Sequence, residues 1–263
     1  MNVKRRTVVL GGAALVAGAS GAAWVLRRGH SAPTPISLRT YDWQIADFRS
    51  GGTTGLPRDL PDPLFRAEPQ CTATLDKVLG PCHTNDVPIR GEITEGVKGL
   101  PTRVSFRIVH AGVCAPISGA DVEIWHADAR GVYSGRAAGM CNPRDEAARE
   151  AAYLRGRQIT NADGQVHFLT VYPGWYSGRA VHVHVRILVE GRELLITQFL
   201  FDDALSDLVY QNHPDYIARP VRDTMNGGDT VFDVGEAARF IFDVEKLDSG
   251  VLQASYTIGV ASG

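Results

Sequence analysis

The sequence lacks the signatures of several common protein classes. It has 263 residues with a formal net charge of −2, and it shows no basic patch or stripe of the kind that binds nucleic acid. It also has no solenoid-type repeat and no heptads, which argues against repeat proteins and coiled coils. Helical patterns are scarce, and the best two lie at residues 143–153 and 204–210. The length fits one domain with extensions, or two small domains.

Cysteine is sparse, and its spacing is informative. The chain has four cysteines and no CxxC pair, which argues against a zinc knuckle or a thioredoxin-type site. They are Cys71, Cys82, Cys114 and Cys141. In an exported chain an even count permits two disulfides with three possible pairings. We expect at least one disulfide, and the sequence leaves its partners open.

What the chain has in quantity is turn residues and short runs of β-branched residues. It contains 28 glycines and 14 prolines, and 44% of its residues are apolar. Such runs, separated by turn signals, predict an all-β fold. We expect a β-sandwich with long functional loops and few short helices. The candidate strands are residues 102–109, 120–126, 165–170, 181–189, 194–201, 231–232, 239–244 and 252–258.

The N-terminus has the character of a targeting segment. Arg5 and Arg6 precede an apolar stretch at residues 7–26, and this order resembles a twin-arginine export signal. The stretch is also about the length that spans a bilayer, so a retained anchor helix competes with a cleaved signal. We expect residues 1–31 to be signal or anchor, 32–68 a linker or surface arm, and 69–263 the functional domain. The protein is then periplasmic or extracellular, and membrane anchoring through residues 7–26 stays open.

The segment HVHV contains the strongest candidate site. His182 and His184 alternate with valines, so in a strand both imidazoles share one face while the valines face the core. Tyr176 and Arg179 lie just upstream. Two imidazoles beside a phenol suggest a metal that prefers an anionic oxygen ligand. The competing interpretation is a polar strand face with ordinary surface histidines.

Four motifs, in order, carry a family resemblance. They are GPCHTNDVPIRGEITEG, PISGADVEIWHADARGVYSG, LRGRQITNADGQVHFLTVYPGWYSGRAVHVHVRI and ITQFLF. From about Cys71 to the C-terminus the chain resembles intradiol ring-cleavage dioxygenases, such as catechol 1,2-dioxygenase and protocatechuate 3,4-dioxygenase, and above all their shorter exported members. The resemblance implies one non-haem Fe(III) ion. Its implied ligands are Tyr133, Tyr176, His182 and His184.

The resemblance also implies the reaction. A catechol-type ring is cleaved with O2 between its two hydroxyl-bearing carbons, which yields a cis,cis-muconate-type diacid without an organic cofactor. Tyr176 and Arg179 are the implied catalytic residues, and Arg179 with Gln198 would contact the substrate. His126 and His167 are expected either to contact the metal ligands without binding the metal or to be structural. One departure stands out: Cys82 and His83 replace the aromatic pair that most members carry after Gly-Pro, which leaves substrate preference open.

Two classes of alternative remain. The PISGADVEIWHADARGVYSG and NADGQVHF segments also resemble transthyretin-like binding modules, which need no metal. A copper enzyme that uses the HxH pair would need further histidines at ligand spacing, and a facial-triad oxygenase would need a carboxylate in the motif. The combination of Tyr176, His182 and His184 favours the dioxygenase. Oligomeric state is not predicted.

Overall fold

The alternation of apolar and polar residues produces two sheets that face each other. In this computed structural model, which describes residues 35–57, 59–65, 71–233 and 235–261, each sheet has four strands, in the orders β4-β1-β8-β7 and β3-β2-β5-β6. All pairs are antiparallel except β1 with β8. The strands are β1 (Pro101–His110), β2 (Asp121–Trp125), β3 (Arg155–Ile159), β4 (Gln165–Val171), β5 (His182–Val189), β6 (Arg192–Leu200), β7 (Asp243–Lys246) and β8 (Leu252–Val260).

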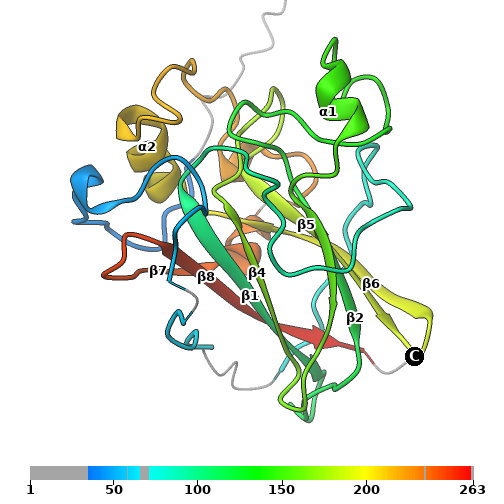
Figure 1. Ribbon diagram of the computed structural model, residues 1–263. Coiled ribbons are helices and arrows are strands. Elements are labelled where there is room, and N and C mark those ends of the chain that lie inside the picture. Colours follow the sequence, from blue (N-terminus) through cyan, green and yellow to red (C-terminus); the bar gives the residue numbers. More distant parts are fainter. Residues whose placement is uncertain (1–34, 58, 66–70, 234, 262–263) are drawn as a thin grey trace, which may run out of the picture. The chain divides into compact units, whose positions relative to one another are not determined.

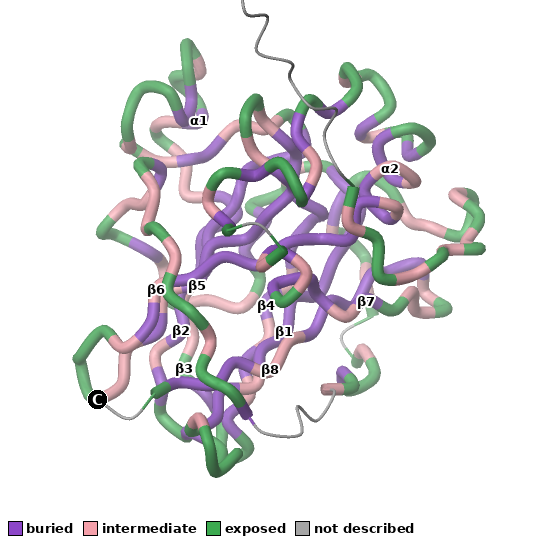
Figure 2. Tube along the Cα trace, turned by 180° about the vertical axis from the view of Figure 1, so that it is seen from behind, coloured by how far each residue is buried: buried purple, intermediate pink, exposed green. Residues whose placement is uncertain are grey.

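The core lies between these sheets. Phe106 of β1 packs against Phe199 of β6 with ring centroids 5.4 Å apart, and Phe242 lies 5.7 Å from Phe106. Val183 and Val185 of β5 are fully buried in the same core, as the sequence pattern predicts. Buried strands occupy the centre of the molecule and exposed loops surround them (Figure 2). Because side chains alternate along a strand and the valines of β5 face the core, the histidines of β5 point to the opposite, outer face of their sheet.

Helices are few and short in the part of the chain that the structure describes. They are α1 (Glu146–Glu150) and α2 (Asp203–Asn212), with 3-10 turns η1 (Ile45–Asp47), η2 (Asn226–Gly228) and η3 (Ala237–Phe240). Both α-helices lie in the connections that follow β2 and β6 (Figure 1). The strand-rich fold with few short helices that the sequence predicts is confirmed.

Three strand predictions need correction. Strand β3 was missed because its sequence, RGRQI, contains a single β-branched residue. The strand predicted at residues 231–232 is wrong: the amides of Val231 and Phe232 donate to the Oδ1 and carbonyl oxygen of Asp229, which makes a turn. The strand predicted at 239–244 begins as η3, becomes extended at Ile241, which forms an isolated bridge with Leu200, and continues into β7.

The predicted arm packs on the functional domain. The amides of Ile36 and Leu38 donate to the carboxylates of Asp203 and Asp202, at 2.7 and 2.6 Å. Tyr41 and Trp43 pack against the core. The predicted signal or anchor, with Arg5 and Arg6, lies outside the described residues. Among the residues that are described, no helix is both long and apolar enough to cross a membrane.

Two disulfides are present, which confirms the expectation of at least one. Cys71 pairs with Cys114, and Cys82 pairs with Cys141. The first pairing anchors the segment before β1 to the turn that follows β1. The second joins the segment before β1 to the long connection between β2 and α1.

His126 makes the free energy of unfolding depend on pH. Its Nδ1 donates to the carbonyl of Ala127 at 2.9 Å, and its Nε2 accepts from the hydroxyl of Thr170 at 2.8 Å. Burial lowers the pKa of His126 to about 4. A depressed histidine pKa means that folding favours the neutral ring, so this stabilisation is complete above the unfolded pKa and is lost as pH falls toward 4.

We therefore expect His126→Gln to flatten the dependence of unfolding free energy on pH between about 6.5 and 4. The change should approach one proton, or about 1.4 kcal/mol per pH unit. Urea unfolding of oxidised protein at several pH values measures this slope. His110→Gln is the matched control, because His110 is exposed. An unchanged slope in His126→Gln would contradict the assignment.

Candidate metal centre

Strand register places three side chains in a row on the outer face of the second sheet. Trp125 of β2 pairs with His184 of β5, and His184 pairs with Gln198 of β6. Paired residues share a face, and so do residues two apart on one strand, which adds His182 to this face. His182 and His184 are only 3% and 2% exposed. Loops therefore cover these histidines, which is inconsistent with an ordinary surface position.

Tyr133 enters the site from the connection after β2. Asp128 starts a tight turn there, because its Oδ1 accepts from the amides of Arg130 and Val132. The Tyr133 amide then donates to Cys141 O at 2.9 Å, and the Tyr133 carbonyl accepts from Asn142 Nδ2 at 3.1 Å. The backbone of Tyr133 is thus held on both sides, and its side chain is 1% exposed.

Tyr176 enters from the connection between β4 and β5. The Arg179 amide donates to the Tyr176 carbonyl at 3.2 Å, which closes a turn directly before β5. The two tyrosine loops meet at Gly131, which has a φ of +83° and where a Cβ would lie 2.2 Å from the carbonyl oxygen of Trp175. Only glycine fits there, and this close approach brings the two tyrosines to one place.

The phenol oxygens converge on His182. Its Nε2 lies 3.1 Å from the Tyr133 hydroxyl and 3.0 Å from the Tyr176 hydroxyl, and the two hydroxyls are 3.4 Å apart. The His184 ring centroid lies 4.9 Å from that of His182 and 6.2 Å from that of Tyr133. Four side chains from three separate segments therefore surround one point.

Each imidazole keeps one ring nitrogen free of hydrogen bonds to the backbone. His182 Nδ1 donates to the Ala180 carbonyl at 2.7 Å, which fixes the tautomer and leaves the Nε2 lone pair facing the phenols. His184 Nδ1 is buried and has no hydrogen-bond partner among the described residues. An orphaned buried nitrogen is costly, and a bound ion is one common explanation for such an atom.

Burial keeps all four groups neutral in the protein alone. It raises the pKa of Tyr133 well above its ordinary value, and it also raises the pKa of Tyr176, although the positive charge of Arg179 partly opposes the second shift. Burial lowers the pKa values of His182 and His184 well below the ordinary value. Neutral imidazole is the metal-binding form, and a hard cation stabilises phenolate. The donor set therefore fits a hard, highly charged metal ion.

The types of side chain in the cluster narrow the choice of metal ion further. In the described part of the chain, no three residues drawn from His, Cys, Asp and Glu gather as a metal site. The gathered set instead contains two imidazoles and two phenols. Imidazole nitrogen and phenolate oxygen together can hold a first-row transition metal such as iron.

Arg179 is held firmly beside Tyr176. Its Nε donates to both carboxylate oxygens of Asp229, at 3.1 and 3.0 Å, and its Nη2 donates to Gln198 Oε1. Its Nη1 lies 3.4 Å from the Tyr176 hydroxyl. Gln198 is fixed in turn by donation to the Val78 carbonyl at 2.8 Å. Asp229 was not identified from the sequence, because it lies 50 residues from Arg179 in a turn with no motif of its own.

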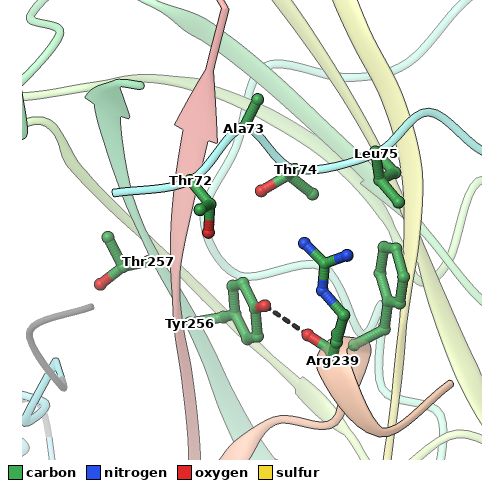
Figure 3. A pocket seen from close by; sticks show the side chains of 8 residues that line it. Thr72, Ala73, Thr74, Leu75, Arg239, Tyr256 and Thr257 are labelled. Carbon is green, nitrogen blue, oxygen red and sulfur yellow. Dashed lines mark hydrogen bonds between the residues drawn. The ribbon is translucent and has the colours of Figure 1, made fainter. Parts of the chain in front are cut away.

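A cavity of about 260 Å³ opens next to these groups. Its lining includes Pro81, Cys82, Tyr133, Met140, Tyr176 and Arg179. A smaller pocket of about 110 Å³ lies elsewhere, between the segment at residues 72–75, η3 and β8. Figure 3 shows its lining, with the Tyr256 hydroxyl donating to the Arg239 carbonyl. None of the predicted site residues lines that smaller pocket.

The structure thus brings together Tyr133, Tyr176, His182 and His184, with Arg179 and Gln198 beside them. His126 lies in the interior and bonds Thr170, and His167 bonds Ser105 at 2.9 Å.

One neighbour of the site was missed. The sequence marked His83 only as a departure from the family pattern, yet it bonds the buried Glu123 at 2.6 Å and its ring centroid lies 4.9 Å from that of Trp125. Trp125 in turn stacks on His184 at 4.7 Å.

A strand-rich fold with a cluster of two histidines and two tyrosines beside a small cavity defines the class of protein. The family model described as Dioxygenase matches residues 85–234. Among curated proteins, 6-chlorohydroxyquinol 1,2-dioxygenase of Cupriavidus pinatubonensis is 32% identical over 142 residues, which cover 46% of this chain and 48% of that protein. The chain therefore matches only about half the length of that relative.

Solved structures similar to this chain are also dioxygenases. An intradiol ring-cleavage dioxygenase from Tetranychus urticae is 29% identical with a TM-score of 0.65, and the match covers 73% of this chain and 95% of that one. The dioxygenase domain of a carbohydrate-binding fusion protein from Streptomyces sp. SirexAA-E is 26% identical with a TM-score of 0.53, covering 73% and 99%. The chain belongs to the intradiol ring-cleavage dioxygenase family.

Proposed function

We propose that the protein is a non-haem Fe(III) dioxygenase that cleaves a catechol-type ring between its two hydroxyl-bearing carbons. Both atoms of O2 enter the product, so catechol plus O2 gives a cis,cis-muconate-type diacid with no other co-reactant. The observation that carries the proposal is the approach of two phenol oxygens to within 3.1 Å of His182 Nε2 at the edge of a cavity. Family membership supports the reaction class.

Tyr133, Tyr176, His182 and His184 would hold the iron. When bound, Fe(III) acts as a Lewis acid that withdraws electron density from a coordinated substrate. Both tyrosines line the cavity, but Tyr133 is buried whereas Tyr176 is partly exposed. Tyr176 is therefore the more accessible tyrosine for an entering substrate. As the phenolate that bound iron would stabilise, its Oη would be placed to accept a proton from a substrate hydroxyl.

Arg179 supplies fixed positive charge beside the reacting ring. Asp229 and Gln198 hold its guanidinium, so its orientation is set before substrate binds. A preorganised cation in a dry site stabilises negative charge that develops on the substrate at little reorganisation cost. Gln198 contributes mainly by fixing Arg179 and the segment at Val78.

The alternatives explain the site less well. A transthyretin-like binding module gives no reason for two buried phenols to approach a buried imidazole nitrogen. A copper enzyme would use further histidines, yet His126 and His167 are occupied by Thr170 and Ser105. Export is part of the proposal: the twin-arginine pattern at Arg5 and Arg6 and the disulfides suit a periplasmic or extracellular enzyme, anchored or free.

We expect His182→Ala and His184→Ala each to abolish stoichiometric iron binding while the fold survives. The apolar side of β5 is untouched by either change, so the core stays packed. Metal analysis and the visible absorption of tyrosinate bound to Fe(III) report iron, and circular dichroism reports the fold. His110→Ala is the exposed control. A histidine variant with full iron and full turnover would refute the ligand assignment.

Arg179→Ala should behave differently from the histidine variants. Because Arg179 contacts the Tyr176 hydroxyl only at 3.4 Å, iron and visible colour should remain. Turnover should fall by roughly 10²–10³-fold, the usual loss when one preorganised donor is removed. Steady-state kinetics with parallel metal analysis tests this expectation. Loss of the metal instead would assign Arg179 a structural role.

The cavity also predicts substrate preference. Arg179 is the one charged residue among those described as lining it, and Asp229 already compensates that charge. A carboxylate on the ring would be buried without a partner, which is costly. We expect kcat/KM for catechol to exceed that for 3,4-dihydroxybenzoate by about tenfold or more, which corresponds to ~1.4 kcal/mol. Equal values would show that another cation reaches the substrate.

A further inference from the structure

We propose that the Cys82–Cys141 disulfide is a positioning element that holds Tyr133 at the metal centre and sets the shape of the adjoining cavity wall. This inference rests on the proposed function, because it assigns Tyr133 to the metal. Neither cysteine contacts the reacting atoms in this view. The disulfide acts through the backbone and packing of Tyr133.

The first observation is direct contact with the tyrosine. The Cys141 carbonyl accepts the Tyr133 amide at 2.9 Å. Cys82, Cys141, Trp125 and Tyr133 form one buried cluster against which Tyr176 packs. Cys82 and Cys141 also line the cavity. A change at the disulfide therefore reaches both the ligand and the substrate pocket.

The segment that leads to Cys141 makes few hydrogen bonds to the rest of the chain, and its shortest one is local, from the Cys141 amide to the Ala138 carbonyl at 2.8 Å. Residues 138–140 are exposed, and the Met140 side chain has 73% of its surface open to solvent. The Ala138 amide reaches the Pro81 carbonyl at only 3.4 Å, a weak hydrogen bond. The disulfide is thus the one covalent link between this exposed connection and the segment at Gly80–His83.

The Gly80–His83 segment is itself fixed against the other side of the centre. At Gly80, with a φ of +78°, a Cβ would lie 3.0 Å from His184 Cε1. His83 bonds Glu123 and makes a T-shaped contact with Trp125, whose ring stacks on His184 with an interplanar angle of 10°. The disulfide therefore couples the Tyr133 loop to a segment that is already seated against His184.

A buried arginine explains why the fold should survive loss of the disulfide. Arg155 is 1% exposed and donates to the Cys82 carbonyl at 2.7 Å and, through Nε, to the Ser134 carbonyl at 3.2 Å. These hydrogen bonds hold the backbone at Cys82 and the backbone next to Tyr133 in place. The Tyr133 hydroxyl, at the far end of its side chain, needs the finer restraint that the disulfide supplies.

The second disulfide is a matched control. Cys71–Cys114 closes a loop of similar length, with a sequence separation of 43 compared with 59 for Cys82–Cys141. Loop length enters the chain-entropy term only logarithmically, so the two disulfides should stabilise the protein by similar amounts. Cys71 and Cys114 belong to neither the buried cluster nor the cavity lining. The control therefore removes comparable stability without touching the centre.

The experiment compares two double variants of the full chain, Cys82→Ser with Cys141→Ser and Cys71→Ser with Cys114→Ser. Iron affinity by chelator competition, the position of the visible band, and kcat and KM for catechol are measured with the melting temperature. We expect the first variant to bind iron roughly 10–100-fold more weakly, the usual cost of losing a group that orients a metal ligand. Its band should shift and its KM should rise. The control should melt earlier while keeping the wild-type band, iron affinity and KM.

A second measurement tests the proposal even if the Cys82→Ser, Cys141→Ser variant folds poorly. In the control variant only Cys82–Cys141 remains, so titration of the folded, iron-loaded protein with a phosphine reductant opens that bond alone. The band should shift in step with thiol formation, measured by alkylation and mass spectrometry, and should recover on reoxidation.

The outcomes are separable. If both variants lose iron affinity in proportion to their melting temperatures, or if opening Cys82–Cys141 leaves the band and KM unchanged, the positioning role is overturned while the proposed function stands. Wild-type protein that binds no iron and cleaves no catechol would overturn the proposed function itself, and this inference with it.

Discussion

The burial of two imidazoles and two phenols around one point is the constraint on which the rest of this structure depends. Polar side chains removed from water need partners, and here they find them mainly in one another, with hydroxyl-to-nitrogen distances of 3.0 and 3.1 Å. Such an arrangement persists only if every segment that supplies a donor is held rigidly. The sheet fixes the histidines, and the loops must be fixed by other means.

The loops are fixed by close backbone contact and by covalent bonds rather than by a large core of their own. Gly131 lets the two tyrosine loops meet, and Gly80 lets the preceding segment lie against His184. The Cys82–Cys141 disulfide and the buried Arg155 tie these segments together where apolar packing is thin. A disulfide suits this task in an oxidising compartment, the setting that the N-terminal sequence predicts.

Contacts from distant segments also hold the charged part of the site. Arg179 faces the cavity, but the buried Asp229 and the β6 residue Gln198 set its orientation. Asp229 also accepts from the Ala180 amide at 2.9 Å, so one carboxylate fixes both the arginine and the start of β5. The electrostatics and the backbone geometry of the site are thus linked. The turn at residues 229–232 must be ordered for Asp229 to hold Arg179 in position.

Much of this protein was determined locally, by the sequence alone. The period-two alternation around His182 and His184 specified a strand, its buried valine face and its outer histidine face, because strand geometry is a local property. The family resemblance of the surrounding motifs, rather than a local physical pattern, singled out Tyr133, Tyr176, Arg179 and Gln198, and the structure places these side chains together. Strand β3 escaped detection, because an RGRQI segment becomes a strand only through pairing with β2.

Only the tertiary structure decided the remaining contacts, because they join segments far apart in the chain. The choice of Cys141 as the partner of Cys82, out of three possible pairings, depends on how two loops pack over β2 and β5. The stacking of Trp125 on His184 depends on strand register, and the T-shaped contact of His83 with Trp125 depends on how the segment before β1 packs over β2. The anchoring of Arg179 by Asp229 depends on a turn that leaves no periodic signal. Local patterns set which face a side chain occupies, whereas long-range packing sets what it touches.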